Sequence, residues 1–230
     1  GDAQKAYDAG VTIGTYLKQL GFNVDYAPVA DVLTNPGNTA IGTRSFGSDA
    51  SMVADMVIKE LEGLSSQGVF GAVKHFPGQG GVSGDSHDGA VTLDKSLEEL
   101  MQTELVPFQK ALENGVSFVM VGHISVPQVV GDNTPASLSQ MMVSNVLREQ
   151  LGYQGIVITD AMNMGAVTGN YTADQAAVMA VNAGVDMILM PQDYETAYNG
   201  LLQAVQDGTI TEERIDESVE RIVKVKLQMQ

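Results

Sequence analysis

The sequence has 230 residues, of which 44% are hydrophobic and 17% charged, so it can form one sizeable core and is globular rather than disordered. Its formal net charge of −16 argues against nucleic acid or an anionic membrane as a partner. The absence of cysteine excludes a disulfide framework and a cysteine zinc site, and no apolar run approaches the ~20 residues of a membrane span. The first residues have no signal-peptide character and are typical of a helix already inside a domain, so we expect an upstream segment to be missing. The compartment therefore stays open between cytoplasm and export.

Helical and strand patterns alternate along the chain. In chain order the expected elements are helix 4–19, strand 22–32, helix 50–66, strand 69–76, helix 94–113, strand 117–124, helix 139–151, strand 155–161, helix 173–183, strand 185–191 and helices 194–206 and 211–228. The strands are short, nearly continuous apolar runs rich in Val, Ile and Met, which is typical of parallel strands covered on both faces.

Polar side chains fall at the ends of four of these strands, namely His75, His123, Asp160 and Asp193. Several strands that contribute to one rim indicate a TIM-like barrel, whereas a Rossmann fold needs a GxGxxG turn that does not occur here. We therefore expect an α/β fold, a TIM-like (β/α) barrel that forms one catalytic domain over residues 1–230. Because five strands do not close an eight-stranded barrel, we expect its N-terminal strands to be missing from this sequence.

The most informative segment is KHFPGQGGVSGDSHDGA, residues 74–90, where Asp85 and His87 stand two residues apart in a glycine-rich loop. An aspartate beside an imidazole fixes its tautomer and raises its basicity, so His87 is a candidate general acid/base. The alternative is that Asp85, Ser86 and Asp88 are ordinary turn residues.

Three further residues are candidates for ligand contacts. Asp160 ends an apolar strand, and a carboxylate there needs water, a partner or a ligand; the alternative is a helix N-cap. Arg44 and Lys74 have basic side chains of the kind that bind carboxylates or hydroxyls. For both of them the alternative is a structural ion pair with Asp31.

Other chemistries lack their motifs. Neither HxH nor HExxH occurs, there is no nucleophile elbow GxSxG, and there is no phosphate-binding loop. We expect neither a metal nor a cofactor.

The run KHFPGQGGVSGDSH resembles the signature of glycoside hydrolase family 3, specifically of its bacterial β-N-acetylglucosaminidases, which carry KHFPGHG, four more residues and DSH. The segments APVADV, IGTRSFG, the GH at His123 and ITDAMNMGAV are similar to the family in the same order, so the resemblance spans nearly the whole chain. The sequence departs from the family pattern at two places: Gln79 replaces the usual histidine, and Gly81-Val82 replaces a usual Asp-Thr. Both departures lie in the glycine-rich loop and concern how well ordered this loop is. The family also has an upstream strand with a DxEGG segment that contributes sugar contacts and is not in this sequence.

The resemblance implies a retaining glycosidase that releases terminal β-linked N-acetylglucosamine. It implies that Asp160 attacks the anomeric carbon, and that His87, with Asp85 as its partner, protonates the leaving oxygen and later deprotonates water. The residues that match sugar-binding or pocket positions are Arg44, Lys74, His75 and His123. The expected partner is a carbohydrate, an N-acetylglucosamine-containing glycan or a muropeptide.

Several alternatives stay open. The DSH loop favours an N-acetylglucosaminidase over a β-glucosidase or β-xylosidase of the same family, because β-glucosidases there usually take their acid/base from a second domain. A catalytically silent, sugar-binding barrel is the alternative from a different class. A neutral histidine does not repel a phosphate acceptor as a carboxylate does, so phosphorolysis is chemically open as well.

Overall fold

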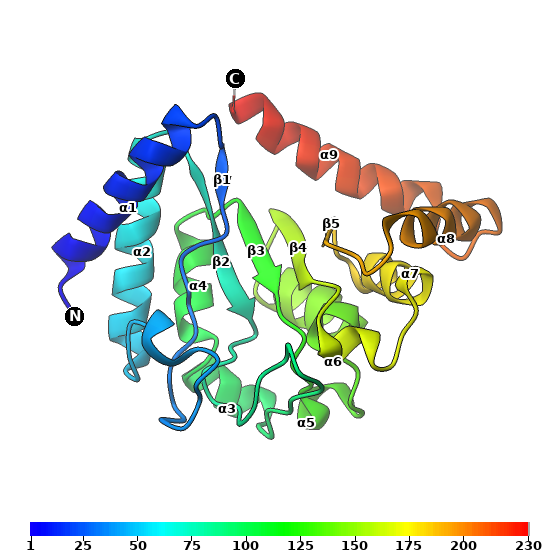
Figure 1. Cartoon of the computed structure of the whole chain (residues 1–230), viewed down its shortest axis with the longest axis horizontal. Coiled ribbons are helices and arrows are strands. Elements are labelled where there is room, and N and C mark those ends of the chain that lie inside the picture. Colours follow the sequence, from blue (N-terminus) through cyan, green and yellow to red (C-terminus); the bar gives the residue numbers. More distant parts are fainter. Residues whose placement is uncertain (230) are drawn as a thin grey trace. The chain divides into compact units, whose positions relative to one another are not determined.

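The computed structural model describes residues 1–229 (Figure 1). Its strands are β1 (Val24–Asp25), β2 (Phe70–Phe76), β3 (Phe118–Val121), β4 (Ile156–Ala161) and β5 (Met187–Leu189). Its α-helices are α1 (Ala3–Gln19), α2 (Ala50–Ser66), α3 (Leu97–Gln102), α4 (Val106–Glu113), α5 (Pro127–Val130), α6 (Gly165–Thr168), α7 (Ala173–Ala183), α8 (Tyr194–Gln206) and α9 (Glu212–Gln228). Two short 3₁₀ helices, η1 (Gly42–Arg44) and η2 (Ala136–Leu138), and a π-helix, η3 (Met141–Gln150), are interspersed among them.

The strands follow the order β1-β2-β3-β4-β5, with β1 parallel to β2 and β4 parallel to β5. Parallel strands in sequential order with helices between them confirm the predicted α/β class. The chain forms two compact units, unit 1 with residues 1–83 and 96–120, and unit 2 with residues 84–95 and 121–228.

In unit 1, helices α1 and α2 lie side by side (Figure 1). Each begins at an aspartate whose side chain accepts a backbone N–H of the first turn, Asp2 from Lys5 and Asp49 from Met52. Such caps satisfy donors that a helix start otherwise leaves unbonded. The core beneath β2 is apolar and close-packed, with the ring of Phe76 edge-on to that of Phe108 at 5.5 Å between centroids.

Two expected elements of unit 1 differ from the prediction because of proline. The expected strand 22–32 is regular only at β1, since Pro28 has no N–H to donate. The chain nevertheless continues beside β2, where the N–H of Ala30 donates to the carbonyl of Lys74 at 2.6 Å. The expected helix 94–113 is two helices, with a break at Thr103 and with Pro107 in the first turn of α4.

Unit 2 carries the second core. Helix α7 begins with a reciprocal capping box between Thr172 and Gln175 and ends at Gly184, which adopts the left-handed conformation at φ 110°. An apolar cluster of Val181, Ala204 and Ile210 joins α7 to α8 and to the turn before α9.

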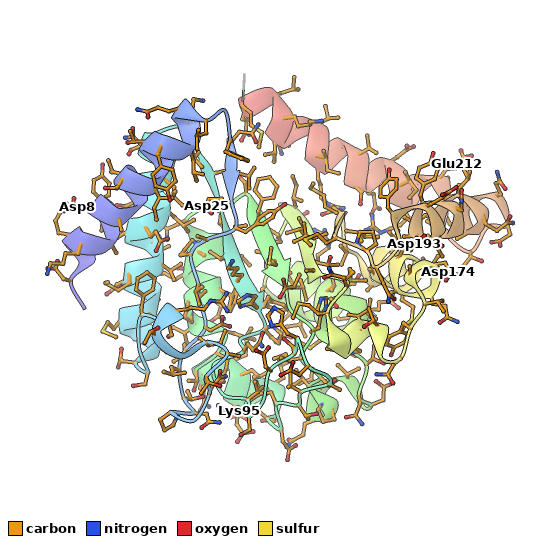
Figure 2. All side chains as sticks on the ribbon, viewed as in Figure 1. Asp8, Asp25, Lys95, Asp174, Asp193 and Glu212 are labelled. Carbon is orange, nitrogen blue, oxygen red and sulfur yellow. The ribbon has the colours of Figure 1, made fainter. Side chains whose placement is uncertain are left out.

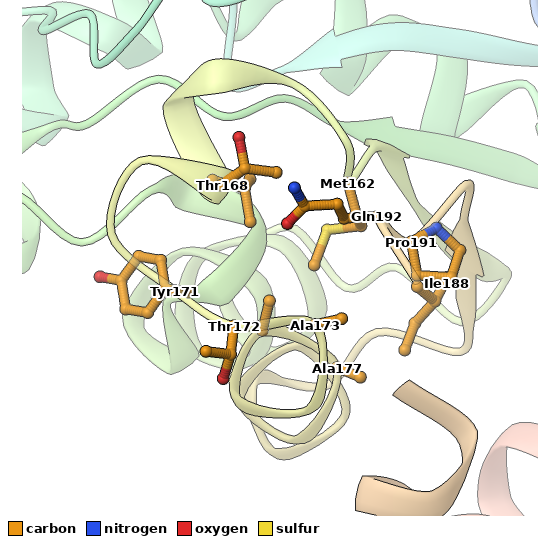
Figure 3. A pocket seen from close by; sticks show the side chains of 11 residues that line it. Met162, Thr168, Tyr171, Thr172, Ala173, Ala177, Ile188, Pro191 and Gln192 are labelled. Atoms are coloured by element: carbon orange, nitrogen blue, oxygen red, sulfur yellow. The ribbon is translucent and has the colours of Figure 1, made fainter. Parts of the chain in front are cut away.

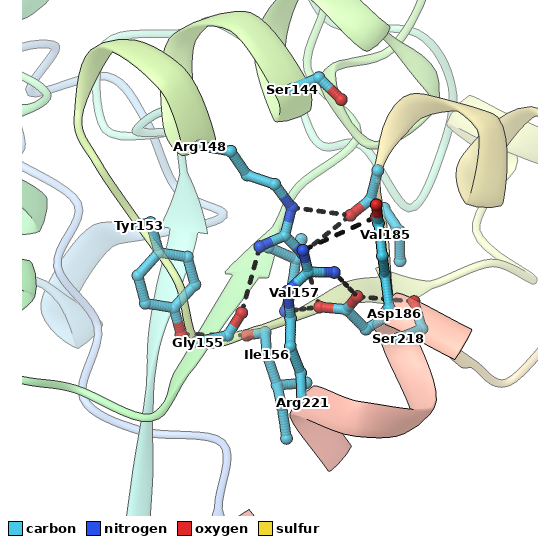
Figure 4. Close-up of polar contacts among 12 residues, drawn as sticks. Ser144, Arg148, Tyr153, Gly155, Ile156, Val157, Val185, Asp186, Ser218 and Arg221 are labelled. Atoms are coloured by element: carbon cyan, nitrogen blue, oxygen red, sulfur yellow. Dashed lines mark hydrogen bonds and ion pairs between the residues drawn. The ribbon is translucent and has the colours of Figure 1, made fainter. Parts of the chain in front are cut away.

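The base of β4 and β5 is held by one buried carboxylate, that of Asp186, whose side chain is 0% exposed (Figure 4). It bonds to a set of side chains from η3 and α9: Arg148 at 2.6 Å, Ser218 at 2.7 Å and Arg221 at 3.1 Å, with Arg214 at 3.8 Å. It also accepts the backbone N–H of Val157 at 2.8 Å. Burial lowers the pKa of Arg148, and the charge of Asp186 opposes that shift. The network therefore fixes the start of β4 to the start of β5.

Acidic residues account for much of the surface charge. Asp8 of α1, Asp193 at the start of α8 and Glu212 of α9 are exposed (Figure 2). Asp193 also accepts the N–H of Thr196 and so caps α8. Within residues 1–229, no helix combines the length and the apolar character that crossing a membrane requires.

Candidate active site

Unit 1 presents a buried Asp31–His75 pair. The carboxylate of Asp31, 0% exposed, accepts the ring Nδ1–H of His75 at 2.7 Å and the backbone N–H of Gln79 at 2.6 Å. Because a carboxylate only accepts, Nδ1 of His75 carries the proton in this contact. From the sequence, Asp31 was expected only as an ion-pair partner of Arg44 or Lys74. In the structure its carboxylate orients the ring of His75.

The turn after His75 is packed against the segment that bears Asp31. A Cβ at Gly80 would lie 2.0 Å from the carbonyl oxygen of Val32, so the close approach needs glycine. The carbonyl of Gln79 accepts the side-chain amide of Asn38 at 2.6 Å. The departure at Gln79 therefore lies in a well-bonded turn, and its side chain is buried.

Arg44 and Lys74 have different surroundings. The exposed Arg44 donates to the carbonyl of Ala40 at 3.2 Å and makes no ion pair within residues 1–229. The structural ion pair with Asp31 is therefore not formed by Arg44, and its guanidinium stays accessible to a ligand. The ammonium of Lys74 lies near two carboxyls of unit 1 and opposes the rise that burial imposes on the pKa of Asp25 and of Glu60.

In unit 2, Asp160 stands half-buried at the carboxyl end of β4, one residue before the strand ends at Ala161. Its Oδ1 accepts the N–H of Ala161 at 2.8 Å. The cap position of the next helix, α6, is Met164 rather than Asp160, so the helix-cap alternative is not what the geometry favours.

His123 follows β3 and is 1% exposed. Its Nε2 lies 3.0 Å from the carbonyl oxygen of Ala161, and its Nδ1 lies 2.7 Å from the hydroxyl of Ser137. A carbonyl only accepts, so Nε2 carries a proton and, in the neutral ring, Nδ1 accepts from Ser137. The ring thus holds the carbonyl of Ala161, the residue after Asp160, which is a positioning contact. A contact of His123 with sugar stays a prediction.

Asp85 and His87 are hydrogen-bonded to each other. Oδ1 of Asp85 accepts both the backbone N–H of His87 at 2.9 Å and its ring Nδ1–H at 2.6 Å. The imidazole is 65% exposed, which leaves Nε2 as the nitrogen that can exchange a proton with a ligand. The alternative of ordinary turn residues does not account for this second, side-chain contact.

The His87 loop (residues 84–90) is docked on the start of α6. The N–H of Gly165 donates to the carbonyl of His87 at 3.1 Å, and the N–H of Ala166 donates to that of Ser86 at 3.1 Å. A Cβ at Gly165 would lie 2.7 Å from the carbonyl oxygen of His87, so a larger residue would push the loop away. The loop is therefore bonded to a segment that begins five residues after Asp160.

The far end of that loop is also fixed. Leu93 and Ser125 exchange backbone contacts, with the N–H of Leu93 on the carbonyl of Ser125 at 2.9 Å and the N–H of Ser125 on that of Val91 at 2.9 Å. Ser125 stands two residues after His123, so the loop carrying the dyad is tied to the segments that follow both β3 and β4.

Unit 2 also contains a small pocket with an empty volume of about 230 Å³, which lies between α6, the first turns of α7 and the end of β5 (Figure 3). Met162, two residues after Asp160, lines it together with Thr168, Tyr171 and Gln192. The predicted site residues do not line it. Among residues 1–229 there is no cluster of His, Asp and Glu suited to a metal ion.

The comparisons with known proteins identify the family of this chain. The profile described as "Glycosyl hydrolase family 3 N terminal domain" matches residues 1–225, and the chain belongs to that family. The β-hexosaminidase LpqI of Mycobacterium bovis is 36% identical over 231 residues, which cover 97% of this chain and 59% of that protein.

Two solved structures are similar over almost the whole chain. A family 3 β-N-acetylglucosaminidase from Paenibacillus sp. str. FPU-7 is 41% identical with a TM-score of 0.97, covering 100% of this chain and 44% of that one. The β-glucoside phosphorylase BglX bound to 2FGlc is 28% identical with a TM-score of 0.95, covering 99% and 42%. These likenesses confirm the predicted TIM-like barrel class. The chain spans about half the length of the curated relatives it matches.

Three residues that support the candidate site residues within their own units were not predicted from the sequence: Asp31 in unit 1, and Ser137 and Gly165 in unit 2. Asp31 carried a signal, because a carboxylate inside the apolar run PVADV calls for a buried partner. Ser137, the partner of His123, and Gly165, the docking point of the loop, carried none, since their roles depend on which distant segment lies against them.

Proposed function

We propose that this chain contains the catalytic apparatus of a retaining β-N-acetylglucosaminidase, with Asp160 as nucleophile and the His87–Asp85 dyad as acid/base. The observation that carries the proposal is the docking of the His87 loop, through two backbone hydrogen bonds, on the segment that follows Asp160. A nucleophile and an acid/base that act on one glycosidic bond need such a fixed relation.

In the first step, a carboxylate oxygen of Asp160 attacks the anomeric carbon of the terminal sugar. The bond between that carbon and the leaving oxygen breaks, and Nε2–H of His87 gives its proton to the leaving oxygen. The product is a glycosyl ester of Asp160 and a neutral imidazole. The bond from Nδ1–H to Asp85 stabilises the positive ring before the transfer and orients Nε2.

In the second step, the neutral Nε2 of His87 takes a proton from water, and the water oxygen attacks the anomeric carbon. The ester bond to Asp160 breaks and the carboxylate is restored. Two displacements at one carbon give retention of configuration. One difficult displacement is thereby divided into two easier ones.

We assign sugar binding to Arg44, Lys74, His75 and His123, as the family resemblance implies. The accessible guanidinium of Arg44 and the oriented ring of His75 support this assignment. The expected substrate is a glycan that ends in β-linked N-acetylglucosamine, such as a chitin oligomer or a muropeptide. LpqI, one of the relatives, is itself named a β-hexosaminidase.

The test compares hydrolysis of aryl β-N-acetylglucosaminide, β-glucoside and β-xyloside by the chain. We expect the N-acetylglucosaminide to be preferred and proton NMR to detect the β-anomer as the first product. Preference for glucoside or xyloside indicates the other branch of the family. First release of the α-anomer contradicts the double displacement, and binding without turnover indicates a silent sugar-binding barrel.

A His87→Gln variant separates acid catalysis from binding. It loses more rate on aryl glycosides with poor leaving groups than on those with good ones, because only the former need the proton. Equal losses across the leaving-group series contradict the assignment of His87.

Phosphorolysis is the second candidate, favoured by the uncharged base and by the similarity to a β-glucoside phosphorylase. In this reaction phosphate replaces water in the second step and forms a sugar 1-phosphate. Product analysis with and without inorganic phosphate decides between the two acceptors; absence of sugar 1-phosphate removes this candidate.

A further inference from the structure

The pairing of β4 with β5 changes register at Asp160. Ile158 lies opposite Met187, and Ala161 lies opposite Leu189, so three steps along β4 match two steps along β5. One residue of the pair Thr159 and Asp160 is therefore extra. Such bulges redirect the side chains beside them and are frequent next to active sites.

The hydroxyl of Thr159 closes the gap that this bulge creates. Its Oγ1 accepts the backbone N–H of Leu189 at 3.0 Å, and the Thr159 side chain is buried with the residue 0% exposed. In a regular parallel ladder a backbone carbonyl of the neighbouring strand accepts that N–H. The carbonyl of Leu189 in turn accepts the N–H of Met162 at 2.9 Å, beyond the bulge.

Asp160 thus stands between two fixed points. Before it, the Thr159 hydroxyl ties β4 to Leu189; after it, Nε2 of His123 holds the carbonyl of Ala161 at 3.0 Å. The carboxylate accepts the N–H of Ala161, the residue whose carbonyl His123 holds. A change in the bulge therefore rotates the residue whose carboxylate must point at the anomeric carbon.

We propose that Thr159 is a positioning residue of the reaction, whose hydroxyl replaces a backbone acceptor in the β4–β5 ladder and so aims the carboxylate of Asp160. The proposal rests on the proposed nucleophilic role of Asp160. It distinguishes the hydroxyl from the methyl group of Thr159, because only the hydroxyl maintains the bulge, whereas the methyl fills the core.

The experiment uses Thr159→Val, which keeps the shape and removes the acceptor, and Thr159→Ser, which keeps the acceptor. Ser144→Ala is the matched control, since its hydroxyl donates to the carbonyl of Ala183 away from the bulge. Each protein is treated with a 5-fluoro N-acetylglucosaminyl donor, and the rate of covalent inactivation is measured. Hydrogen exchange of the Leu189 amide and thermal unfolding are recorded alongside.

Thr159→Val is expected to inactivate about 10- to 100-fold more slowly, because misplacing a reacting group by about 1 Å has that effect. Its Leu189 amide exchanges faster, and its KM for the aryl substrate is unchanged. Thr159→Ser and Ser144→Ala inactivate at the wild-type rate. If Thr159→Val does not fold, Thr159→Cys replaces the hydroxyl with a weak sulfur acceptor. We expect its stability to lie between those of Thr159→Ser and the wild type, and its inactivation to be slow.

Wild-type rates in both Thr159→Val and Thr159→Cys overturn the positioning role while the proposed nucleophile stands. A Thr159→Ser variant as slow as Thr159→Val also overturns it, because the methyl group is then what matters. A wild-type chain that the reagent does not label overturns the nucleophile itself, which is a different failure.

Discussion

Replacing Gly165 with alanine perturbs the docked position of the His87 loop without touching the dyad. The added Cβ would lie 2.7 Å from the carbonyl oxygen of His87 and 3.2 Å from that of Asp88. Restoring the ordinary contact distance of 3.4 Å requires a shift of about 0.7 Å. Gly165 begins α6 without a left-handed φ, so alanine meets the loop and not its own backbone.

The expected magnitude follows from the contacts that this shift breaks. Two backbone hydrogen bonds, from Gly165 to His87 and from Ala166 to Ser86, hold the loop. At about 1 kcal/mol each, their loss of about 2 kcal/mol lowers the equilibrium constant between docked and undocked loop about 30-fold. If the proposed proton shuttle acts only when docked, kcat falls by up to about 30-fold while KM changes little.

The assay measures kcat and KM on an aryl β-N-acetylglucosaminide together with hydrogen exchange of residues 84–90. Gly89→Ala is the matched control in the same loop, since a Cβ there meets nothing within 4 Å. If Gly165→Ala turns over as fast as Gly89→Ala, docking on α6 is not needed for proton transfer and the reasoning is refuted.

Three other predictions concern charge. Asp186→Asn leaves its arginines without their counter-ion and lowers the free energy of unfolding by about 3 to 5 kcal/mol in urea titrations, whereas Glu62→Gln, at an exposed pair, changes it little. Burial, and then the charge of Asp25, raises the pKa of Glu60 from 4.5 to about 7, so the folded state favours the protonated carboxyl. That stabilisation is complete below pH 4.5 and is lost as the pH rises through 7. In Glu60→Gln, the free energy of unfolding should fall by about 2 kcal/mol less than in the wild type between about pH 5 and 8. An unchanged pH profile of stability contradicts this prediction. Asp85→Asn keeps the loop but weakens the acceptor of the imidazole proton, so kcat falls about 10- to 100-fold at constant KM, and wild-type kcat argues against the dyad.

The helices and strands of this chain were predictable where periodicity and length agree, as in α1, α2, β4 and α9. The predicted element boundaries were wrong at two prolines. Pro28 shortens β1, and Pro107 lies in the first turn of a second helix within the expected helix 94–113. Both errors arise because a missing N–H interrupts a hydrogen-bond ladder while the apolar pattern continues across it.

The candidate site residues could be selected from the sequence because polar side chains are costly at the ends of apolar strands, as for Asp160 and His123. The contacts that support them were not visible, although the carboxylate within PVADV indicates that Asp31 needs a buried partner. The role of Thr159 depends on a register change against Leu189, and that of Asp31 on the chain returning through His75. Contacts of this kind are set by which strands become neighbours, and no local pattern encodes them.

The proposed mechanism depends on a transient bond between one particular carboxylate and the sugar. The decisive measurement is peptide mass spectrometry of the chain after brief reaction with a 5-fluoro N-acetylglucosaminyl donor. We expect one sugar adduct on the β4 peptide, located at Asp160 and absent in Asp160→Asn. An adduct on any other carboxylate, or turnover of the donor with no adduct at all, contradicts it.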